Sequence, residues 1–239
     1  SLRPELQEAF RMKFGKDIFE GYGCTETTPV ASVNTENMLL NDFLTMQINN
    51  KPGSVGMALP GTRFRIVDPD TNEELPVGEA GMILIGGCQV MVGYLKDPER
   101  TAQALIEIDG KRWYRTGDKG YLDEDGFLTI VDRYSRFAKI GGEMVSLGAV
   151  EMRIQDTQVL KGFDYAVTSI KDAVKGERLV LLFEGEKDPA TVLQELRQSG
   201  IPSLMIPSVA FVVEHLPKLG TGKMNLKLVK EIAISLTQR

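Results

Sequence analysis

The spacing of apolar residues changes character near residue 132, and this change limits the possible folds most strongly. Before it, apolar and polar residues alternate, as in residues 62–67, and a turn-rich stretch at residues 123–126 links two such runs. Alternation of this kind predicts strands and a β-hairpin. After it, strand-like runs alternate with helical stripes, such as the one in residues 147–154. The chain is therefore expected to combine a β-rich part with a small α+β domain.

The same patterns predict individual elements. Helices are expected at residues 4–14, 147–154, 189–196 and 228–236. Strands are expected at residues 17–22, 62–67, 82–85, 121–122, 127–131, 165–170, 179–183 and 209–213. The glycine-rich region of residues 78–101 indicates turns, a strand and a helix start, and we expect scaffold there with few ligand contacts.

Composition excludes several classes of protein. The 239 residues carry a formal net charge of −5, which argues against a nucleic-acid binder. Cys24 and Cys88 do not form a metal-spaced cluster or a disulfide framework, and His215 is the only histidine, which disfavours a histidine triad or a zinc site. No apolar run approaches the length of a membrane span, and no signal peptide is visible. The start at Ser1 suggests a piece of a longer protein.

A first chemical motif is GYGCTE at residues 21–26. Gly21 and Gly23 allow the backbone to approach a ligand closely. Tyr22 offers a flat face for a purine, Thr25 can donate to a phosphate oxygen, and the Glu26 carboxylate suits Mg²⁺. The alternative is a strand-ending turn with a buried tyrosine.

Two further motifs lie in predicted turns. Asp118 follows Tyr114–Gly117 and can accept hydrogen bonds from both hydroxyls of a ribose, although an acidic residue there is more often a simple turn residue. Lys223 ends the glycine-rich loop 219–223. A lysine on such a loop can neutralise developing phosphate charge, and otherwise it is a solvated charge.

Residues 132–147 carry three cations, Arg133, Arg136 and Lys139, before the double glycine Gly141–Gly142. A solvated linker is one interpretation. The apolar residues within the segment favour a packed one.

The order and spacing of these motifs over nearly the whole chain resemble the acyl-activating (adenylate-forming) superfamily. The residues that carry the resemblance are GYGCTE, GEAGMILIGG, VGYL, PERT, YRTGD, DRYSRFAKIGGEMVSL and LGTGK. The resemblance implies an α/β fold with a β-rich subdomain. Residues 1–50 would be the tail of a large adenylating domain, 51–132 a distorted β-barrel subdomain, and 133–239 a small mobile C-terminal domain.

The resemblance also implies roles for residues of the first motif. Tyr22 stacks on adenine, Gly21 and Gly23 shape the nucleotide loop, Thr25 contacts phosphate, and Glu26 binds Mg²⁺. ATP and Mg²⁺ are the cofactors expected.

The later motifs receive roles in the same way. Asp118 holds the ribose with help from Arg133, and Lys223 bridges the carboxylate substrate and the α-phosphate. Gly141–Gly142 lines the thiol path after the small domain rotates. The hinge falls at Ser135, where many relatives carry aspartate or lysine.

A closer resemblance is to the acyl-[acyl carrier protein] synthetase modules of bifunctional 2-acylglycerophosphoethanolamine acyltransferases, carried by RFAKIGGEMVSL and residues 169–177. It implies a fatty acid substrate, acyl carrier protein as acceptor, attracted by Arg133, Arg136 and Lys139, and a cytoplasmic location or one at the inner membrane. The alternatives are an acyl-CoA synthetase that uses coenzyme A and a non-catalytic binding module.

The Ser/Thr/Gly-rich phosphate loop of the superfamily does not occur in these residues. The family places it before GYGCTE, together with most of the acyl pocket. We therefore expect the 239-residue chain by itself to fold but not to catalyse.

Overall fold

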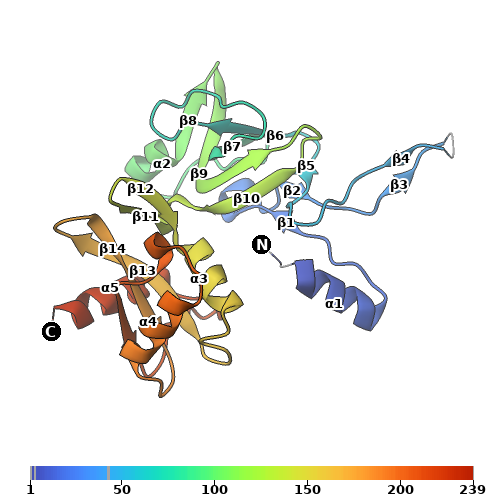
Figure 1. Cartoon of the computed structure of the whole chain (residues 1–239). Helices are drawn as coiled ribbons and strands as arrows, with labels where there is room; N and C mark the ends of the chain where they lie inside the picture. Colours follow the sequence, from blue (N-terminus) through green and yellow to red (C-terminus); the bar gives the residue numbers. More distant parts are fainter. Residues whose placement is uncertain (1, 3, 42–43, 239) are drawn as a thin grey trace. The chain divides into compact units, whose positions relative to one another are not determined.

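The computed structural model describes residues 2, 4–41 and 44–238. It divides into two compact units, Ser1–Tyr134 and Ser135–Arg239 (Figure 1). The fold is mixed α/β with a β-rich first unit, so the predicted fold class is confirmed. In the part of the chain that the structure describes, no helix is long and apolar enough to cross a membrane.

The first unit is built mainly from antiparallel sheets. Its strands are β1 (Gly21–Tyr22), β2 (Ser32–Val33), β3 (Met38–Leu39), β4 (Met46–Gln47), β5 (Met57–Ala58), β6 (Thr62–Val67), β7 (Gly81–Gly87), β8 (Leu105–Ile108), β9 (Lys111–Leu122) and β10 (Leu128–Arg133). Its helices are α1 (Pro4–Phe14), the 3₁₀ turn η1 (Thr25–Thr27) and α2 (Pro98–Ala104). The strand orders are β1-β2-β5 and β10-β9-β7-β6, with β8 added on β9.

The predicted strand over residues 17–22 is wrong over its first part. The β1–β2 ladder contains only the pairs Gly21↔Val33 and Tyr22↔Ser32. An alternating pattern indicates extended backbone, but a strand also needs a partner along its length. The hairpin expected around residues 123–126 is confirmed, since β9 and β10 pair from Leu122 and Leu128 onward.

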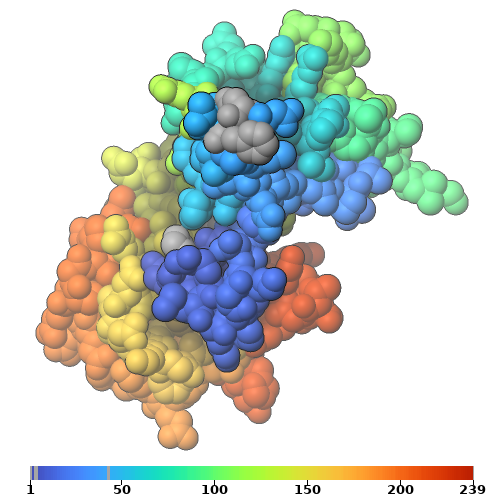
Figure 2. All heavy atoms as spheres, turned by 90° about the vertical axis from the view of Figure 1, so that its right-hand side faces the viewer, coloured from blue at the N-terminus to red at the C-terminus, as the bar shows by residue number. Residues whose placement is uncertain are grey.

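An arm formed by β3 and β4 exposes apolar side chains. Leu44 is 91% exposed, and Met38, Leu39 and Met46 are also exposed. Figure 2 shows the light-blue atoms of this region at the surface facing the viewer. The sequence pattern does not predict this arm, because it has no buried face to create an alternation.

The second unit is a sheet covered by helices on both faces. Its elements after the short turn η2 (Tyr134–Arg136) are β11 (Phe137–Ile140), β12 (Glu143–Ser146), α3 (Leu147–Asp156), β13 (Tyr165–Asp172), β14 (Gly176–Phe183), α4 (Pro189–Gln198), η3 (Ser203–Met205), β15 (Val209–Val212) and α5 (Leu226–Thr237). The strand order is β12-β11-β14-β13, and β15 pairs with β14 in parallel.

Neighbouring residues of one strand enter opposite cores of this unit. Val167 packs with residues of α3 and α4, whereas Ala166 packs with residues of α5. This follows from the two-residue period of a strand. Residues 137–146 form the β11–β12 hairpin, in which Ala138 and Val145 are buried, so the solvated-linker interpretation is wrong there.

Candidate active site

The GYGCTE motif forms the end of β1 and the 3₁₀ turn η1. A Cβ atom placed on Gly23 would lie 1.9 Å from the carbonyl oxygen of Pro29, so no other residue fits without moving the backbone. The Thr27 hydroxyl accepts a hydrogen bond from the Cys24 N–H at 3.2 Å and donates to the Cys24 carbonyl oxygen at 3.1 Å. This second glycine and the buried Thr27 therefore set the backbone that presents Thr25 and Glu26, with the Thr25 residue exposed.

Tyr22 is directed toward Asp118 by its packing. The ring packs against a buried cluster that includes Ile83 and Leu128, and the hydroxyl donates to Asp118 Oδ2 at 2.5 Å. Burial and the neighbouring carboxylate raise the pKa of Tyr22 well above its ordinary value, so the phenol stays protonated and can donate. The predicted stacking on adenine stays a prediction, and the structure adds a hydrogen bond that orients Asp118.

Asp118 lies in a bulge of β9. Met82 pairs with Lys119 and Leu84 with Arg115, so two steps along β7 correspond to four along β9. Gly117 has a φ of +76°, which glycine adopts without strain. The Asp118 N–H donates to the hydroxyl oxygen of Thr116 at 3.0 Å. Bulges of this kind re-aim side chains beside active sites.

Arg133 completes a group of three residues that we call the Asp118 cluster, made of Tyr22, Asp118 and Arg133. Its Nε donates to Asp118 Oδ1 at 3.1 Å. The Arg133 side chain is 68% exposed and the Asp118 side chain is 9% exposed. The carboxylate is therefore bound by Tyr22, whose ring packs against the buried cluster, and by Arg133, whose side chain is largely in solvent. Each carboxylate oxygen already accepts one bond and has a further lone pair, which leaves capacity for two ligand hydroxyls.

Glu26 has a partner in the glycine-rich region of residues 78–101, which was expected to be scaffold. The Tyr94 hydroxyl donates to Glu26 Oε1 at 2.6 Å, and the Met91 N–H donates to the Glu26 carbonyl oxygen at 2.9 Å. Burial acts to raise the pKa of Glu26, but the Tyr94 hydrogen bond and other donors outweigh it, so the pKa is lowered. The guanidinium carbon of Arg100 lies 4.0 Å from the Tyr94 ring centroid. The only sequence signal for Tyr94 is its place in the VGYL motif.

The oxygen donors near Glu26 fit a Mg²⁺ ion that the protein and the phosphates of a substrate would bind together. Among the residues that the structure describes, no group of three or more His, Cys, Asp or Glu could hold a metal by itself. Mg²⁺ is commonly held by one or two carboxylates together with phosphate oxygens and waters. The ionised Glu26 carboxylate is a group of the type that could supply one such ligand.

Lys223 lies in a hydrogen-bonded turn of the second unit, which we call the Lys223 turn (residues 218–224). Lys218 bridges to Met224, and the Leu219 N–H donates to the Lys223 carbonyl oxygen at 2.7 Å. Gly222 has a φ of +81°. The backbone is therefore closed, while Lys223 itself is exposed.

Gly141 and Gly142 form the turn of the β11–β12 hairpin, with φ values of +59° and +94°. Positive φ at both central residues is the pattern of a type I′ turn and favours glycine at each. Ser135 is the first residue of the second unit. Its hinge role and the thiol-path role of the glycines stay predictions.

Two of the three cations expected to attract a carrier protein have partners inside the fold. Arg133 pairs with Asp118, and the Arg136 Nη2 lies 2.6 Å from Glu151 Oε2 with both side chains largely buried. The charge of the largely buried Arg136 is therefore neutralised within the fold. Arg133, with a side chain that is 68% exposed, and Lys139 remain at the surface.

Comparisons with known proteins identify the family of the chain. The family model described as "AMP-binding enzyme" matches residues 1–95. The chain is 33% identical to 4-coumarate–CoA ligase 1 of Glycine max, over 98% of this chain and 78% of that protein. It is 32% identical to a long-chain-fatty-acid–CoA ligase of Bacillus subtilis (strain 168), over 94% of this chain and 38% of that protein.

Among solved structures, ATP-bound MatB from Rhodopseudomonas palustris matches with a TM-score of 0.76 at 29% identity, over 97% of this chain and 43% of that one. The chain thus spans about two fifths of MatB and of the Bacillus ligase. From the extent of the match to the soybean ligase, the chain belongs to the family of AMP-binding, adenylate-forming enzymes.

Proposed function

We propose that the chain carries the nucleotide-holding and thiol-transfer elements of an acid–thiol ligase that uses ATP and coenzyme A. The observation that carries this proposal is the buried Asp118 carboxylate, oriented by Tyr22 and Arg133 in a member of the AMP-binding family. The substrate is a carboxylic acid, with fatty acids favoured by the Bacillus relative and aromatic acids by the plant one.

The proposed reaction has two steps. A carboxylate oxygen attacks the α-phosphorus of ATP, the bond to pyrophosphate breaks, and an acyl-adenylate forms. A thiolate then attacks the activated carbonyl, and AMP leaves. Asp118 holds the ribose, Thr25 contacts phosphate, and Lys223 neutralises charge at the α-phosphate during the first step. Glu26, together with the phosphates, would hold Mg²⁺, which would supply further charge neutralisation.

The change from the first step to the second is proposed to be a rotation about Ser135. It would present Lys223 for adenylation and Gly141–Gly142 for thiol transfer. One set of substrate contacts then serves both steps, as in other enzymes with mobile domains.

Coenzyme A is preferred as acceptor because the relatives named above are CoA ligases. Acyl carrier protein, linked to acylation of 2-acylglycerophosphoethanolamine, is the second candidate and rests on the RFAKIGGEMVSL segment. A non-catalytic binding module is disfavoured, because such a module would need Asp118 but not Lys223.

The test uses the chain together with any sequence that flanks it in its gene. The protein is supplied with ATP, Mg²⁺, a fatty or hydroxycinnamic acid, and either coenzyme A or phosphopantetheinylated carrier protein. We expect AMP, pyrophosphate and acyl-CoA. Release of ADP instead of AMP would overturn the proposal, and thioester formation on the carrier alone would select the second candidate. Asp118→Ala is the matched inactive control.

A further inference from the structure

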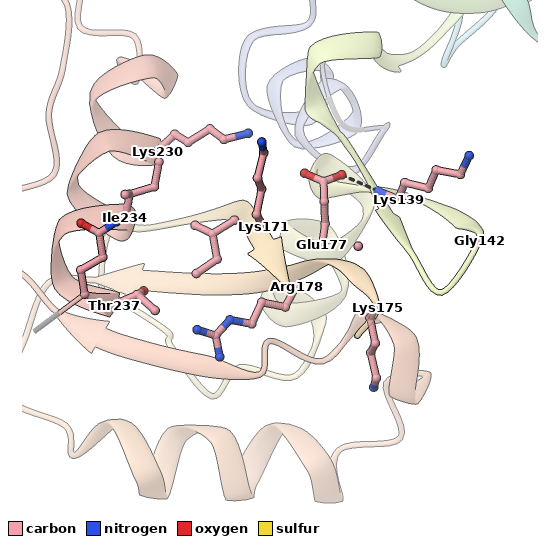
Figure 3. Close-up of a pocket in the computed structure, with 12 residues that line it drawn as sticks. Lys139, Gly142, Lys171, Lys175, Glu177, Arg178, Lys230, Ile234 and Thr237 are labelled. Carbon is pink, nitrogen blue, oxygen red and sulfur yellow. Dashed lines mark hydrogen bonds between the residues drawn. The ribbon is translucent and has the colours of Figure 1, made fainter. Parts of the chain in front are cut away.

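Each unit of the structure contains a cavity lined by cations. The cavity of the second unit has a volume of about 910 Å³, and Figure 3 shows its carboxylate, Glu177, bonded to the Lys139 N–H. Gly142 also lines this cavity, so it lies beside the thiol path proposed above. The cavity of the first unit has a volume of about 440 Å³, and the proposed reaction does not use it. We call it the Arg63 cavity, after one of its lining residues.

The Arg63 cavity forms over three neighbouring strands, of which the middle one lacks a side chain. Arg63 of β6 is paired with Gly86 of β7, and Gly86 is paired with Trp113 of β9. Residues opposite one another share a face of the sheet, so the glycine leaves a notch between β6 and β9. Neighbouring strands lie about 4.8 Å apart, so side chains of β6 and β9 flank a notch roughly 10 Å wide. Lys111 lies two residues before Trp113 and therefore on the same face.

Packing explains the glycines of this cavity. A Cβ atom on Gly86 would lie 2.8 Å from a ring carbon of Trp113. A Cβ atom on Gly87 would lie 2.6 Å from the carbonyl oxygen of Gly61. The floor of the cavity is therefore fixed by the fold, and the cations around it need a separate explanation.

The cations of the Arg63 cavity lack carboxylate partners. No carboxylate is among the described residues that line it, and its charged lining residues are Arg63, Lys111 and Arg112. None of the three forms an ion pair in the part of the chain that the structure describes, whereas Arg65, two residues after Arg63, contacts two carboxylates. Arg112 faces Glu107 across the β8–β9 ladder without an ion pair. In a chain of net charge −5, this local excess of positive charge favours an anion.

A polar group in the wall of the cavity also lacks a partner. Trp113 lines the cavity and is 3% exposed, and its indole Nε1 has no hydrogen-bond partner among the described residues. A buried donor without an acceptor is uncommon, and a water or an ion often accounts for one. This observation is independent of the cations and points in the same direction.

The segment that follows β7 joins the Arg63 cavity to the GYGCTE motif. Cys88 lines the cavity. The carbonyl oxygen of Gln89 accepts a hydrogen bond from the Thr28 hydroxyl at 2.6 Å, and the Met91 N–H donates to the Glu26 carbonyl oxygen at 2.9 Å. An ion that restrains Cys88 and its neighbours would therefore also restrain the turn that carries Glu26.

We propose that the Arg63 cavity is a regulatory site for a compact multivalent phosphate anion, and that pyrophosphate released in the first step is its ligand. Guanidinium groups bind phosphates through paired hydrogen bonds, and the two phosphoryl groups of pyrophosphate offer acceptors to cations on both sides of the notch. The choice of pyrophosphate rests on the proposed function, whereas the anion site rests on the cavity alone. Bound pyrophosphate would hold the Glu26 turn in one position and slow a further round of adenylation.

Calorimetric titration of the 239-residue chain with pyrophosphate, without divalent cations, tests the site. Arg63→Gln should lose roughly tenfold in affinity, as expected for one charged hydrogen bond. Arg63→Glu/Lys111→Glu should lose roughly a hundredfold or more, and wild-type binding should weaken as salt is raised. Both side chains are exposed, so the variants should unfold at nearly the wild-type temperature. Lys16→Glu, which changes an exposed lysine of the same unit outside the cavity, should bind like wild type.

Alkylation of Cys88 locates the bound anion. Saturating pyrophosphate should slow the reaction of Cys88 with iodoacetamide several-fold, and it should affect Cys24 of the GYGCTE motif less. Iodoacetamide is uncharged, so repulsion of the reagent by the anion does not enter. Mass spectrometry of the two cysteine peptides measures both rates, and the protection of Cys88 should vanish in Arg63→Glu/Lys111→Glu.

Three outcomes would overturn the proposal. The first is equal pyrophosphate affinity of wild type and the double variant. The second is protection of Cys24 without protection of Cys88, because the anion would then occupy the nucleotide site. The third is a chain that does not bind soluble pyrophosphate but uses the same cations to bind vesicles containing phosphatidic acid, because the phosphate would then belong to a lipid.

Two further measurements separate this proposal from the previous one. Asp118→Ala should lose ATP affinity but bind pyrophosphate as wild type does, so failure of the nucleotide site would leave the anion site standing. In the protein that includes the flanking sequence, Arg63→Glu/Lys111→Glu should keep the initial rate of AMP formation and be inhibited less by added pyrophosphate. Equal inhibition of both proteins would contradict the regulatory role.

Discussion

The Asp118 cluster and the Lys223 turn carry the two charges on which the proposed reaction depends, and the fold holds them in opposite ways. Asp118 is buried, with a donor on each oxygen, and its backbone is set by a bulge. Lys223 is exposed, and hydrogen bonds close only the backbone of its turn. The proposed ribose-binding carboxylate is thus fixed within the folded first unit, whereas Lys223 lies on the surface of the second. Substitution of Asp118 should therefore lower both ATP affinity and the free energy of unfolding. Substitution of Lys223 should lower activity and leave the free energy of unfolding nearly unchanged.

The largest effect is expected for Lys223→Ala. In the protein that includes the sequence flanking this chain in its gene, acyl-adenylate formation should fall by about 10²–10³-fold or more, as when one preorganised charge-stabilising donor is removed. Unfolding free energy should change by less than about 0.5 kcal/mol, because the side chain is exposed. Thiol transfer from a supplied acyl-adenylate should be largely spared.

Pyrophosphate exchange, single-turnover thiol transfer and thermal unfolding measure these three quantities. Lys227→Ala, a change of an exposed lysine on α5, is the matched control. Equal loss in both half-reactions would contradict the alternation of the two units.

Asp118→Ala should come next, with an effect on both binding and stability. Loss of an acceptor for two ribose hydroxyls should weaken ATP binding by about 1.5–3 kcal/mol for each charged hydrogen bond. Removal of the carboxylate also leaves the Tyr22 hydroxyl without its acceptor, at a cost of about 1–3 kcal/mol in unfolding free energy. Calorimetry and urea unfolding give the two numbers. Unchanged ATP affinity would remove Asp118 from the site.

Local chemistry explains which parts could be predicted from the sequence. The helix at α4 begins where Asp188 precedes Pro189, and the Asp188 carboxylate accepts from the Thr191 N–H at 2.9 Å. Such a cap is encoded within four residues. The β9–β10 hairpin is encoded in the same way by a short turn sequence.

The remaining features depend on contacts between distant residues. The Tyr22–Asp118 bond joins residues 96 apart in the chain, and the Tyr94–Glu26 bond joins residues 68 apart. No local pattern encodes such a pair, so Tyr94 could not be distinguished from scaffold. The pairing of Arg136 with Glu151 was missed for the same reason.

Tyr22→Phe sharpens the comparison, because it keeps the ring and removes only the hydroxyl. If the hydroxyl orients Asp118, unfolding free energy should fall by roughly 1.5 kcal/mol, and ATP affinity should fall several-fold. Tyr22→Leu, which also removes the aromatic face, should weaken ATP binding further if adenine stacks there. Identical stability and affinity for Tyr22→Phe and wild type would leave the tyrosine with a stacking role at most.

The smallest effect is expected for Tyr94→Phe, through the ionisation of Glu26. The folded-state pKa of Glu26 lies below its ordinary value of 4.5, partly because the Tyr94 hydroxyl donates to the carboxylate. A depressed carboxyl pKa contributes stability above the unfolded value, and this contribution is lost as the pH falls through the folded value. Tyr94→Phe should therefore raise the Glu26 pKa toward 4.5.

Because the Glu26 carboxylate is partly exposed, solvent screening limits the cost at pH 7 to about 0.5 kcal/mol. That difference between wild type and variant should shrink as the solution is acidified below the folded pKa. Carbon-detected NMR titration of the Glu26 carboxyl group measures the shift directly. Tyr121→Phe, which removes a tyrosine hydroxyl from β9, is the control. An equal Glu26 pKa in wild type and Tyr94→Phe would show that the hydroxyl does not tune this carboxylate. A raised pKa together with weaker Mg²⁺-dependent ATP binding would instead make Tyr94 a positioning residue for the metal ligand.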